Sequence, residues 1–386
     1  MKLIFAHDHI FKKDVCGGIY SPGKLSNQSF TRYLQVFSSV TIVSRVEDAE
    51  NQEVEYFNKI DGDGIHFLGF DNQSNLINRF IRRPYYKRKL RCLISDYDAV
   101  VVRVPSEIGF LVAEIALSLN IPYVCEVVAC PKDAMDGFKS LKATLYSPVL
   151  VRSMKFCVKH AAGALYVTDQ FLQNRYPCLG VTKVASNVEI SGVNSNKSRY
   201  DIETKTSIKI VLTGHLDSVH KGYDTVYLAA ELLESRIDRK IEFILVGSGT
   251  KYKKEFHGTN VSFTFTGALN ATQVIELLDN ADLYIQPSNQ EGLPRATIEA
   301  MSRALPCVVS NAGGLPELID NDFVHEVNDH VQLANKIDEL ITNNTLYWKQ
   351  STLNAVKAEK FISNKLNTIR NSFFSEYKKL LLKTNY

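Results

Sequence analysis

The sequence predicts an α/β protein built from two doubly wound, Rossmann-like domains. Its 386 residues exceed the length of one ordinary domain, which is about 100–200 residues. Short apolar runs alternate with longer segments of 3.6-residue period along the whole chain, and this pattern is typical of parallel strands joined by crossover helices. A polar stretch, SNVEISGVNSNKSRYDIETKT from Ser186 to Thr206, divides the pattern into two halves.

The N-terminal half is predicted to form one domain over residues 1–190. Its strands are expected at the short apolar runs Lys2–Ala6, Val40–Ser44, Ile65–Gly69, Ala99–Val104, Tyr123–Val127, Ala164–Val167 and Lys183–Ala185. Helices are expected in most of the intervals. The linker is predicted at 191–206, because Ser, Asn and charged residues predominate there and the apolar period is weak.

The C-terminal half is predicted to form a second doubly wound domain over residues 207–360. Its strands are expected at Ile208–Leu212, Ile241–Val246, Val261–Phe265, Leu283–Gln286 and Cys307–Ser310, each followed by a loop and a helix. The last segment, 361–386, is predicted to be a helix that packs back on the body. Such sheets bind ligands beyond the carboxyl ends of their strands, so we expect a site in a cleft between the domains.

Composition excludes several classes of protein. Lys and Arg number 45 against 42 Asp and Glu, and the net charge of +3 gives no reason to expect nucleic-acid binding. The seven cysteines show no metal-binding spacing and indicate a reducing, cytoplasmic setting without a metal site. The N-terminus MKLIFAHDHIF is too polar for a signal peptide, and the most apolar region, Ile108–Cys130, carries charges that argue against a membrane span. Docking on a membrane surface remains open.

The loop TGHLDSVHKG follows the first strand of the second half. It carries Gly214, His215 and Lys221 just before a helix predicted over Tyr223–Glu234. A glycine loop, a helix start and a lysine together suit an anion. A plain βα turn with a solvated lysine is an equal alternative on this segment alone. The next strand ends in VGSG, which lacks the third glycine of a dinucleotide loop and favours a turn over an NAD site.

The most informative stretch is PSNQEGLPRATIEAMSRALPCVVSNAGGLPELI, which follows the strand Leu283–Gln286. Glu291 lies in the loop, Gly292 permits close backbone approach, and Pro294 suits the first position of a helix expected over Arg295–Ala304. Glu299 falls one turn inside that helix. Two carboxylates beside an anion site match the hydroxyls and phosphates of a nucleotide sugar. Taken singly, either glutamate could be a helix-dipole or surface charge.

At these residues the chain resembles the retaining nucleotide-sugar glycosyltransferases of GT-B fold, specifically glycosyltransferase family 4. The resemblance rests on motifs in order: the Gly17–Gly18 loop, TGHLDSVHKG, VGSG, FTGALN, ADLYIQPSNQEGLP, the spacing of Glu291 and Glu299, IEAM and GGLPE. It implies a GT-B architecture and a nucleoside-diphosphate sugar as donor. It also implies transfer without a metal cofactor to a saccharide or polyprenyl-diphosphate-linked acceptor, in O-antigen, capsule or exopolysaccharide biosynthesis.

The resemblance also implies roles for individual residues. Lys221 and the backbone of Gly292, Leu293, Pro294 and Arg295 would hold the diphosphate, Glu299 the ribose and Glu291 the donor sugar, while Gly18 would pack against the phosphates from the other domain. Charge would build on the departing oxygen, where donors already aimed at it lower the barrier. In such retaining enzymes the acceptor attacks from the leaving-group side, so a dedicated base is not required.

The sequence departs from the family pattern in two places. His215 stands where many members carry an arginine, and an imidazole is only partly charged near neutral pH. Many members also carry a histidine after the strand Tyr123–Val127, where this chain has CEVVACP with Glu126 as the nearest polar residue. Glu126 and Arg103 are interpreted either as donor or acceptor contacts or as structural groups.

The segment RFIRRPYYKRKLR interleaves basic and aromatic residues. Its cations could dock the protein on the inner face of the plasma membrane through anionic headgroups; they are Arg79, Arg82, Arg83, Lys87 and Arg88. The alternative is a solvated basic helix broken at Pro84.

Two other functions remain compatible with the sequence. A GT-B-like nucleotide-sugar epimerase would need acid and base groups near the sugar, which Glu126, Glu291 and His9 could supply. A non-catalytic nucleotide-binding scaffold is suggested only by His215. The nucleobase, the donor sugar, the acceptor and the oligomeric state are not readable from the sequence.

Overall fold

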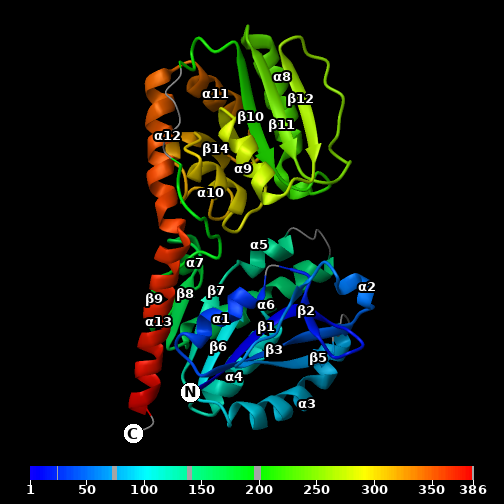
Figure 1. Ribbon diagram of the computed structural model, residues 1–386, viewed down its shortest axis with the longest axis vertical. Coiled ribbons are helices and arrows are strands. Elements are labelled where there is room, and N and C mark those ends of the chain that lie inside the picture. The colour runs from blue at the N-terminus through cyan, green and yellow to red at the C-terminus, as the bar shows by residue number, and fades with distance from the viewer. Residues whose placement is uncertain (24, 72–75, 137–140, 195–200, 385–386) are drawn as a thin grey trace. The chain divides into compact units, whose positions relative to one another are not determined.

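A computed structural model of the protein describes residues 1–386 except 24, 72–75, 137–140, 195–200 and 385–386 (Figure 1). The chain divides into two compact units. The first unit comprises Met1–Ala185 together with Asn367–Tyr386, and the second comprises Ser186–Leu366. Each unit has its own sheet and its own hydrophobic core.

The first unit is built on a mainly parallel sheet. Its parallel strands lie in the spatial order β5 (Ile65–Asp71), β3 (Ser39–Asp48), β1 (Lys2–Lys13), β6 (Ala99–Val104), β7 (Tyr123–Val127), β8 (Gly163–Tyr166) and β9 (Val181–Val184). Two short antiparallel strands, β2 (Ile19–Ser21) and β4 (Asn58–Lys59), extend the edge beside the end of β1. Strands β6 and β7 have the predicted bounds. Strand β1 runs past Ala6 because a bulge re-aligns Ile10–Lys13 with β3.

Helices cover both faces of this sheet because the strand residues alternate. Ile4 and Ala6 of β1 face a core shared with α3 (Leu76–Ile94), α4 (Glu107–Ser118) and α6 (Leu141–Lys159). On the other face the ring of Phe5 lies 5.4 Å from that of Phe30 in α1 (Asn27–Leu34). Three short helices complete the unit, namely α2 (Asn51–Val54), α5 (Pro131–Asp136) and α7 (Phe171–Arg175).

The C-terminal helix α13 (Ser363–Thr384) supplies part of the first unit's core. The ring of Phe374 lies 5.1 Å from that of Tyr33. The hydroxyl of Tyr377 accepts a hydrogen bond from the Val100 amide at 2.9 Å and donates one to the Pro122 carbonyl at 2.7 Å. Phe374 and Tyr377 of α13 therefore complete the core of a unit whose sheet is formed by residues 2–184.

The second unit contains a parallel sheet in the order β12 (Val261–Gly267), β11 (Lys240–Val246), β10 (Ser207–Thr213), β13 (Leu283–Gln286), β14 (Cys307–Ser310) and β15 (Val324–His325). Its helices are α8 (Tyr223–Arg236), α9 (Ala271–Asp279), α10 (Arg295–Ser302), α11 (His330–Ile341) and α12 (Asn344–Ala358), with 3-10 turns η1 (Val219–Lys221), η2 (Asn321–Phe323) and η3 (Glu359–Phe361). Strands β13 and β14 have the predicted bounds. Helix α10 ends before the predicted Ala304, whose φ of 56° is left-handed.

The division between the units falls after Ala185, ahead of the linker predicted at 191–206. Val188 and Ile190 are buried in the second unit's core, and the Asn194 amide donates to the Ser302 carbonyl at 2.8 Å. Part of the polar stretch therefore packs on the second unit because its few apolar side chains find a core there. Residues 195–200 of the linker lie outside the described part of the chain.

Candidate functional site

The second unit's sheet changes direction between β10 and β13. These two strands are neighbours, yet the chain proceeds outward from β10 to β11 and β12, and from β13 to β14 and β15. In open parallel sheets this switch point leaves a crevice beyond the carboxyl ends of the strands. The loop after β10 carries Lys221 and the loop after β13 carries Glu291. The topology thus brings together two of the residues predicted from the sequence.

The side chain of Lys221 packs closely over the backbone of Gly214. It ends the turn η1, and Gly222 follows with a left-handed φ of 71°. A Cβ on Gly222 would lie 1.9 Å from the Pro287 carbonyl oxygen, and a Cβ on Gly214 would lie 2.9 Å from the Lys221 Cγ. The Nζ atom of Lys221 donates to Oε1 of Glu291. The side chains are 24% and 14% exposed, so this ion pair is largely shielded from water.

Glu291 is oriented by a chain of buried polar groups that the sequence reasoning missed. The Tyr284 hydroxyl donates to Gln286 Oε1 at 2.5 Å, and Gln286 Nε2 donates to Ser288 Oγ at 2.8 Å. Ser288 Oγ then donates to Glu291 Oε1 at 3.1 Å. Gln286 and Ser288 are fully buried. The sequence signal that could have indicated this relay is the run of polar groups at every second residue, Tyr284 and Gln286 in the strand and Ser288 in the loop that follows it.

The loop after Glu291 leads into α10 with open backbone donors. Pro294 is the residue before the helix rather than its first residue, and no side chain caps the helix start. A Cβ on Gly292 would meet no atom within 4 Å, whereas Leu293 packs against the core. Arg295 NH1 lies 3.8 Å from Glu299 Oε1, with side chains 42% and 28% exposed. The helix start is therefore accessible and positive, with Glu299 one turn away.

His215 belongs to a loop that is hydrogen-bonded to the VGSG turn. Its Nδ1 accepts the Asp217 amide at 3.2 Å, so the ring proton of a neutral imidazole resides on Nε2. The Asp217 carboxylate accepts the Thr250 and Lys251 amides, each at 2.8 Å. A Cβ on Gly247 would lie 1.9 Å from the Gly214 carbonyl oxygen. These contacts favour the turn interpretation of VGSG over a dinucleotide site.

Gly18, in the first unit, lies in a loop closed around a carboxylate. Oδ1 of Asp14 accepts the amides of Gly18 at 2.7 Å and Cys16 at 2.9 Å, and Oδ2 accepts the Tyr20 hydroxyl at 3.0 Å. Desolvation alone would raise the pKa of Asp14, but these hydrogen bonds outweigh it and lower the pKa. Gly18, predicted to pack against the phosphates, thus has its amide hydrogen-bonded to a carboxylate of its own loop.

Arg103 and Glu126 meet in a buried cluster of the first unit. Arg32 NH2 lies 3.0 Å from Glu126 Oε1, the Tyr33 hydroxyl donates to that oxygen at 2.6 Å, and Arg103 NH1 lies 3.3 Å from Oε2. Glu126 is 2% exposed. Burial acts to raise its pKa, but the two guanidiniums and the Tyr33 hydroxyl prevail and lower it. This environment favours the structural interpretation of both residues over a substrate contact.

The same cluster borders His7 on β1. Its Nδ1 donates to the Arg103 carbonyl oxygen at 3.1 Å. Burial, followed by the charge of Arg103, lowers the pKa of His7 to about 4. His7 is therefore neutral at neutral pH and adds no charge to this part of the unit.

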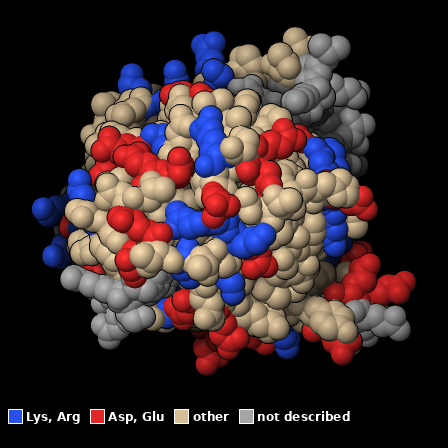
Figure 2. Space-filling model, turned by 90° about the horizontal axis from the view of Figure 1, so that it is seen from above, with Lys and Arg blue, Asp and Glu red and all other residues tan. Residues whose placement is uncertain are grey.

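The basic segment lies on α3, which continues through Pro84 rather than breaking there. Arg83 NH2 and Lys87 Nζ lie 2.8 and 2.6 Å from the carboxylate of Glu114 on α4, and Arg88 is exposed. The side chains of Arg79 and Arg82 lie outside the described part of the structure. None of the described helices combines the length and apolar character needed to cross a membrane. On the face shown in Figure 2 the positive and negative side chains are interspersed.

Comparison with known proteins identifies the class of protein. Residues 195–358 match the family described as glycosyl transferases group 1. Protein CapJ of Staphylococcus aureus is 32% identical over 346 residues, which is 88% of this chain and 86% of CapJ. The N,N'-diacetylbacillosaminyl-diphospho-undecaprenol alpha-1,3-N-acetylgalactosaminyltransferase of Campylobacter jejuni is 31% identical over 297 residues, which is 70% of this chain and 74% of that enzyme.

Solved structures give the same fold. The sucrose-phosphate synthase of Thermosynechococcus elongatus superposes with a TM-score of 0.65 at 13% identity, covering 98% of this chain and all of that one. HepE of Anabaena, in complex with UDP, gives 0.63 at 19% identity over 97% of this chain and all of that one. The two Rossmann-like units thus have the GT-B fold. The chain belongs to the group 1 glycosyl transferases and is a GT-B glycosyltransferase.

Proposed function

We propose that the protein is a retaining, family 4 glycosyltransferase that moves a sugar from a nucleoside-diphosphate sugar to a lipid-linked saccharide. One observation carries the proposal, namely the ion pair of Lys221 and Glu291 at the switch point, beside the open backbone of Gly292. A cation, a carboxylate and free amides within one crevice suit a ligand that presents phosphates and hydroxyls together.

In the proposed reaction Lys221 exchanges Glu291 for the diphosphate of the donor. The ammonium group and the uncapped start of α10 would then stabilise the charge that grows on the departing oxygen. Glu291, released from the lysine but still held by Ser288, would accept from hydroxyls of the donor sugar. Glu299 would accept from the ribose. We propose that this positive charge suffices without a metal ion, so a chelator should leave the rate unchanged.

The acceptor proposal draws on a relative. The Campylobacter enzyme, by its name, acts on a saccharide joined through a diphosphate to undecaprenol, and this chain covers 74% of its length. We therefore propose a polyprenyl-diphosphate-linked saccharide as the acceptor and surface polysaccharide assembly as the setting. Such an acceptor resides in a membrane, and the exposed cations of α3 are suited to docking there. Arg83 and Lys87 could exchange Glu114 for headgroups, since exposed ion pairs are worth only about 0–1 kcal/mol.

A thermal-shift panel of UDP, GDP and ADP tests the donor site. A ligand at about 100 times its dissociation constant stabilises a protein by roughly 2.7 kcal/mol. We expect one diphosphate, with UDP tried first because HepE binds it, to raise the melting temperature of the wild type. Lys221→Ala and Glu299→Ala should lose the shift, whereas Lys254→Ala, which removes a surface ion pair of the same unit, should keep it. A panel in which no diphosphate acts would count against the proposal.

Incubation of the donor without acceptor separates the alternatives. A transferase should leave the nucleotide sugar unchanged or hydrolyse it slowly, and should form product only when acceptor is added. A new nucleotide sugar would indicate an epimerase. Binding without turnover under all conditions would indicate a scaffold.

Alanine at Gly313 should lower stability, whereas alanine at Gly292 should lower activity with little effect on stability. Gly313 has a φ of 57°, and its Cβ would lie 1.8 Å from the Glu291 carbonyl oxygen, so Gly313→Ala should cost about 1–3 kcal/mol of stability. Gly292→Ala should change stability by less than about 0.5 kcal/mol because its Cβ meets open space. It should nevertheless lower kcat/KM about tenfold or more, because the methyl group would obstruct a phosphate. Urea unfolding and steady-state kinetics measure the two effects, and unimpaired kinetics in Gly292→Ala would exclude a backbone contact there.

His215→Arg should keep or raise kcat/KM above pH 7. A guanidinium is always charged and offers several donors, whereas a neutral His215 ring offers only its Nε2–H because Nδ1 accepts the Asp217 amide. Steady-state kinetics of wild type and variant at several pH values above 7 measure the effect. His257→Arg, at an exposed position of the same unit, is the control. Complete loss of activity in His215→Arg would contradict the assignment of this position to the phosphates.

A further inference from the structure

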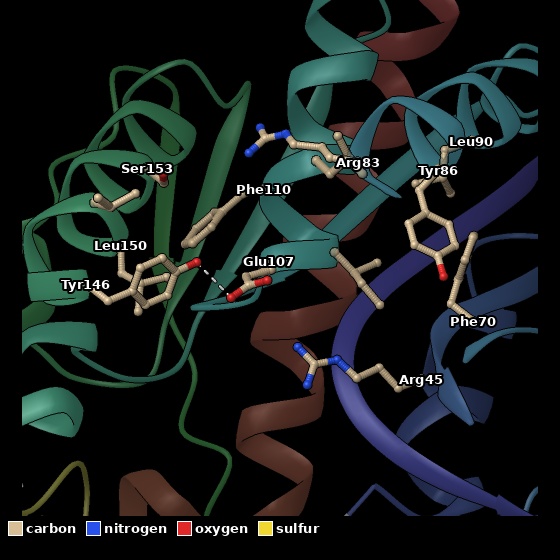
Figure 3. Close-up of a pocket in the computed structure, with 13 residues that line it drawn as sticks. Arg45, Phe70, Arg83, Tyr86, Leu90, Glu107, Phe110, Tyr146, Leu150 and Ser153 are labelled. Carbon is tan, nitrogen blue, oxygen red and sulfur yellow. Dashed lines mark hydrogen bonds between the residues drawn. The ribbon is translucent and has the colours of Figure 1, made fainter. Parts of the chain in front are cut away.

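The first unit contains a cavity that the donor site does not use. It has a volume of about 140 Å³ and lies among α3, α4, α6 and the ends of β3 and β5. Figure 3 shows Phe110 and Tyr146 on one side and Phe70 and Tyr86 on the other. The walls are completed mainly by branched aliphatic residues, namely Leu90, Ile108, Leu111, Val149 and Leu150.

The lining selects an apolar ligand. Leu, Ile, Val and aromatic side chains make up most of the lining, and such walls favour an apolar group over water. The ring of Tyr86 packs edge-on against Phe70 at 5.2 Å, which gives that wall a fixed shape. The space accommodates a short stretch of hydrocarbon chain rather than a whole lipid tail.

One end of the cavity is polar and lies at the carboxyl edge of the sheet. The guanidinium of Arg45, in the second half of β3, points toward the middle of the cavity in Figure 3, and its NH2 lies 3.1 Å from Oδ2 of Asp8. Opposite it, the Tyr146 hydroxyl donates to Glu107 Oε1 at 2.8 Å. A guanidinium offers several N–H donors in one plane and suits a phosphate oxygen. A ligand with an apolar chain and a phosphate head would match both ends once its phosphate replaced the Asp8 carboxylate at Arg45.

The surroundings of the cavity on α6 are suited to a membrane. Leu145, Val149 and Phe156 are 79%, 49% and 48% exposed, and their spacing places them along one side of the helix. Arg152 and Lys159 fall on the same side. Exposed apolar side chains can contact the acyl boundary of a bilayer, and cations beside them can contact its anionic headgroups. Val149 both lines the cavity and reaches solvent, so the cavity adjoins this surface.

We propose that this cavity binds the head-proximal isoprenoid units of the lipid-linked acceptor, with Arg45 at the phosphate. The inference rests on the proposed function, because it takes the polyprenyl diphosphate of that acceptor as its occupant. It adds a lipid-chain site, separate from the donor crevice, that would hold the acceptor while its saccharide reacts.

Direct binding of farnesyl diphosphate, below its micelle concentration and without donor, tests the proposal by titration calorimetry. We expect inorganic diphosphate to bind at least about tenfold more weakly, because the chain supplies most of the burial. Val149→Glu places a charge in the wall, and Ser153→Trp fills the cavity. Each variant should lower the affinity for farnesyl diphosphate at least about tenfold. The matched controls are Val356→Glu, at a 61% exposed helix position of the second unit, and Ser153→Ala.

The outcomes separate this proposal from the donor site. Equal affinity for inorganic diphosphate would overturn it in favour of an anion site, and equal affinity for a short-chain phosphatidic acid would overturn the isoprenoid assignment. Unchanged affinity in both cavity variants would show that the lipid binds elsewhere. The nucleotide thermal shift should persist in every variant. If farnesyl diphosphate does not bind while the nucleotide thermal shift remains, only the cavity proposal is contradicted. If the nucleotide thermal shift is absent in the wild type, the proposed function is contradicted.

Discussion

Replacing Lys221 by alanine should lower kcat by about 100- to 1000-fold while leaving the protein folded. Removing one preorganised donor from a developing oxyanion typically costs this much. Lys221 ends a surface turn and its ammonium group pairs with Glu291, so its loss removes little of the core. Steady-state kinetics with saturating donor, together with a thermal melt of each variant, measure the two effects.

Two control variants test whether the charge of Lys221 and its position matter. Lys221→Arg keeps a cation and should retain more activity than Lys221→Ala, although the planar group fits less well over Gly214. Lys254→Ala removes a half-exposed lysine of the same unit and should leave kcat within about twofold. A loss below about tenfold in Lys221→Ala, with donor binding intact, would contradict the role of this lysine at the leaving group.

Replacing Glu126 by alanine should destabilise the first unit by about 3–5 kcal/mol. The substitution leaves Arg32 and Arg103, each with a side chain 14% exposed, without the carboxylate they share. The Tyr33 hydroxyl loses its acceptor as well. Urea unfolding followed by circular dichroism measures the free energy of unfolding through the helices and strands of the whole chain. The single tryptophan, Trp348, reports on the second unit and should respond less.

A surface glutamate serves as the control for Glu126. Glu255→Ala, at a position whose side chain is 91% exposed, should change stability by less than about 0.5 kcal/mol. A similarly small effect in Glu126→Ala would show that the buried cluster is not structural. Loss of activity without loss of stability would instead restore the interpretation of Glu126 as a substrate contact.

The effect of Glu126 should also depend on pH. Its pKa is lower in the folded protein than in the unfolded chain, so its contribution is fully present above the ordinary carboxyl pKa of about 4.3. That contribution is lost as the pH falls through the folded value, because the unfolded state then takes up the proton first. The difference in stability between wild type and Glu126→Ala should therefore be constant near neutral pH and shrink below about pH 4.

The sequence predicted the buried strands well because their apolar runs are continuous. Strands β6, β7, β13 and β14 have the predicted bounds, and each is almost wholly buried. The two- and three-residue strands β2, β4 and β15 were not predicted, because such short segments show no period. The polar end of β1 was missed because its pairing with β3 resumes only after a bulge.

The candidate site was partly predictable for a topological reason. Lys221 and Glu291 lie 70 residues apart, but both follow strands of a parallel sheet, and such loops converge at one edge. The partnership of Arg32 with Glu126, 94 residues apart, has no comparable signal. It depends on how α1 packs on the face of the sheet, and side-chain packing between distant elements leaves no period in the sequence.

The helix α13 has a consequence for the order in which the protein is made. The second unit is continuous from Ser186 to Leu366, whereas the first is interrupted by it and resumes at Asn367. During synthesis the N-terminal strands leave the ribosome long before Phe374 and Tyr377 exist to cover them, and domains generally fold as units. The unit that is translated first is therefore the one whose core is completed last.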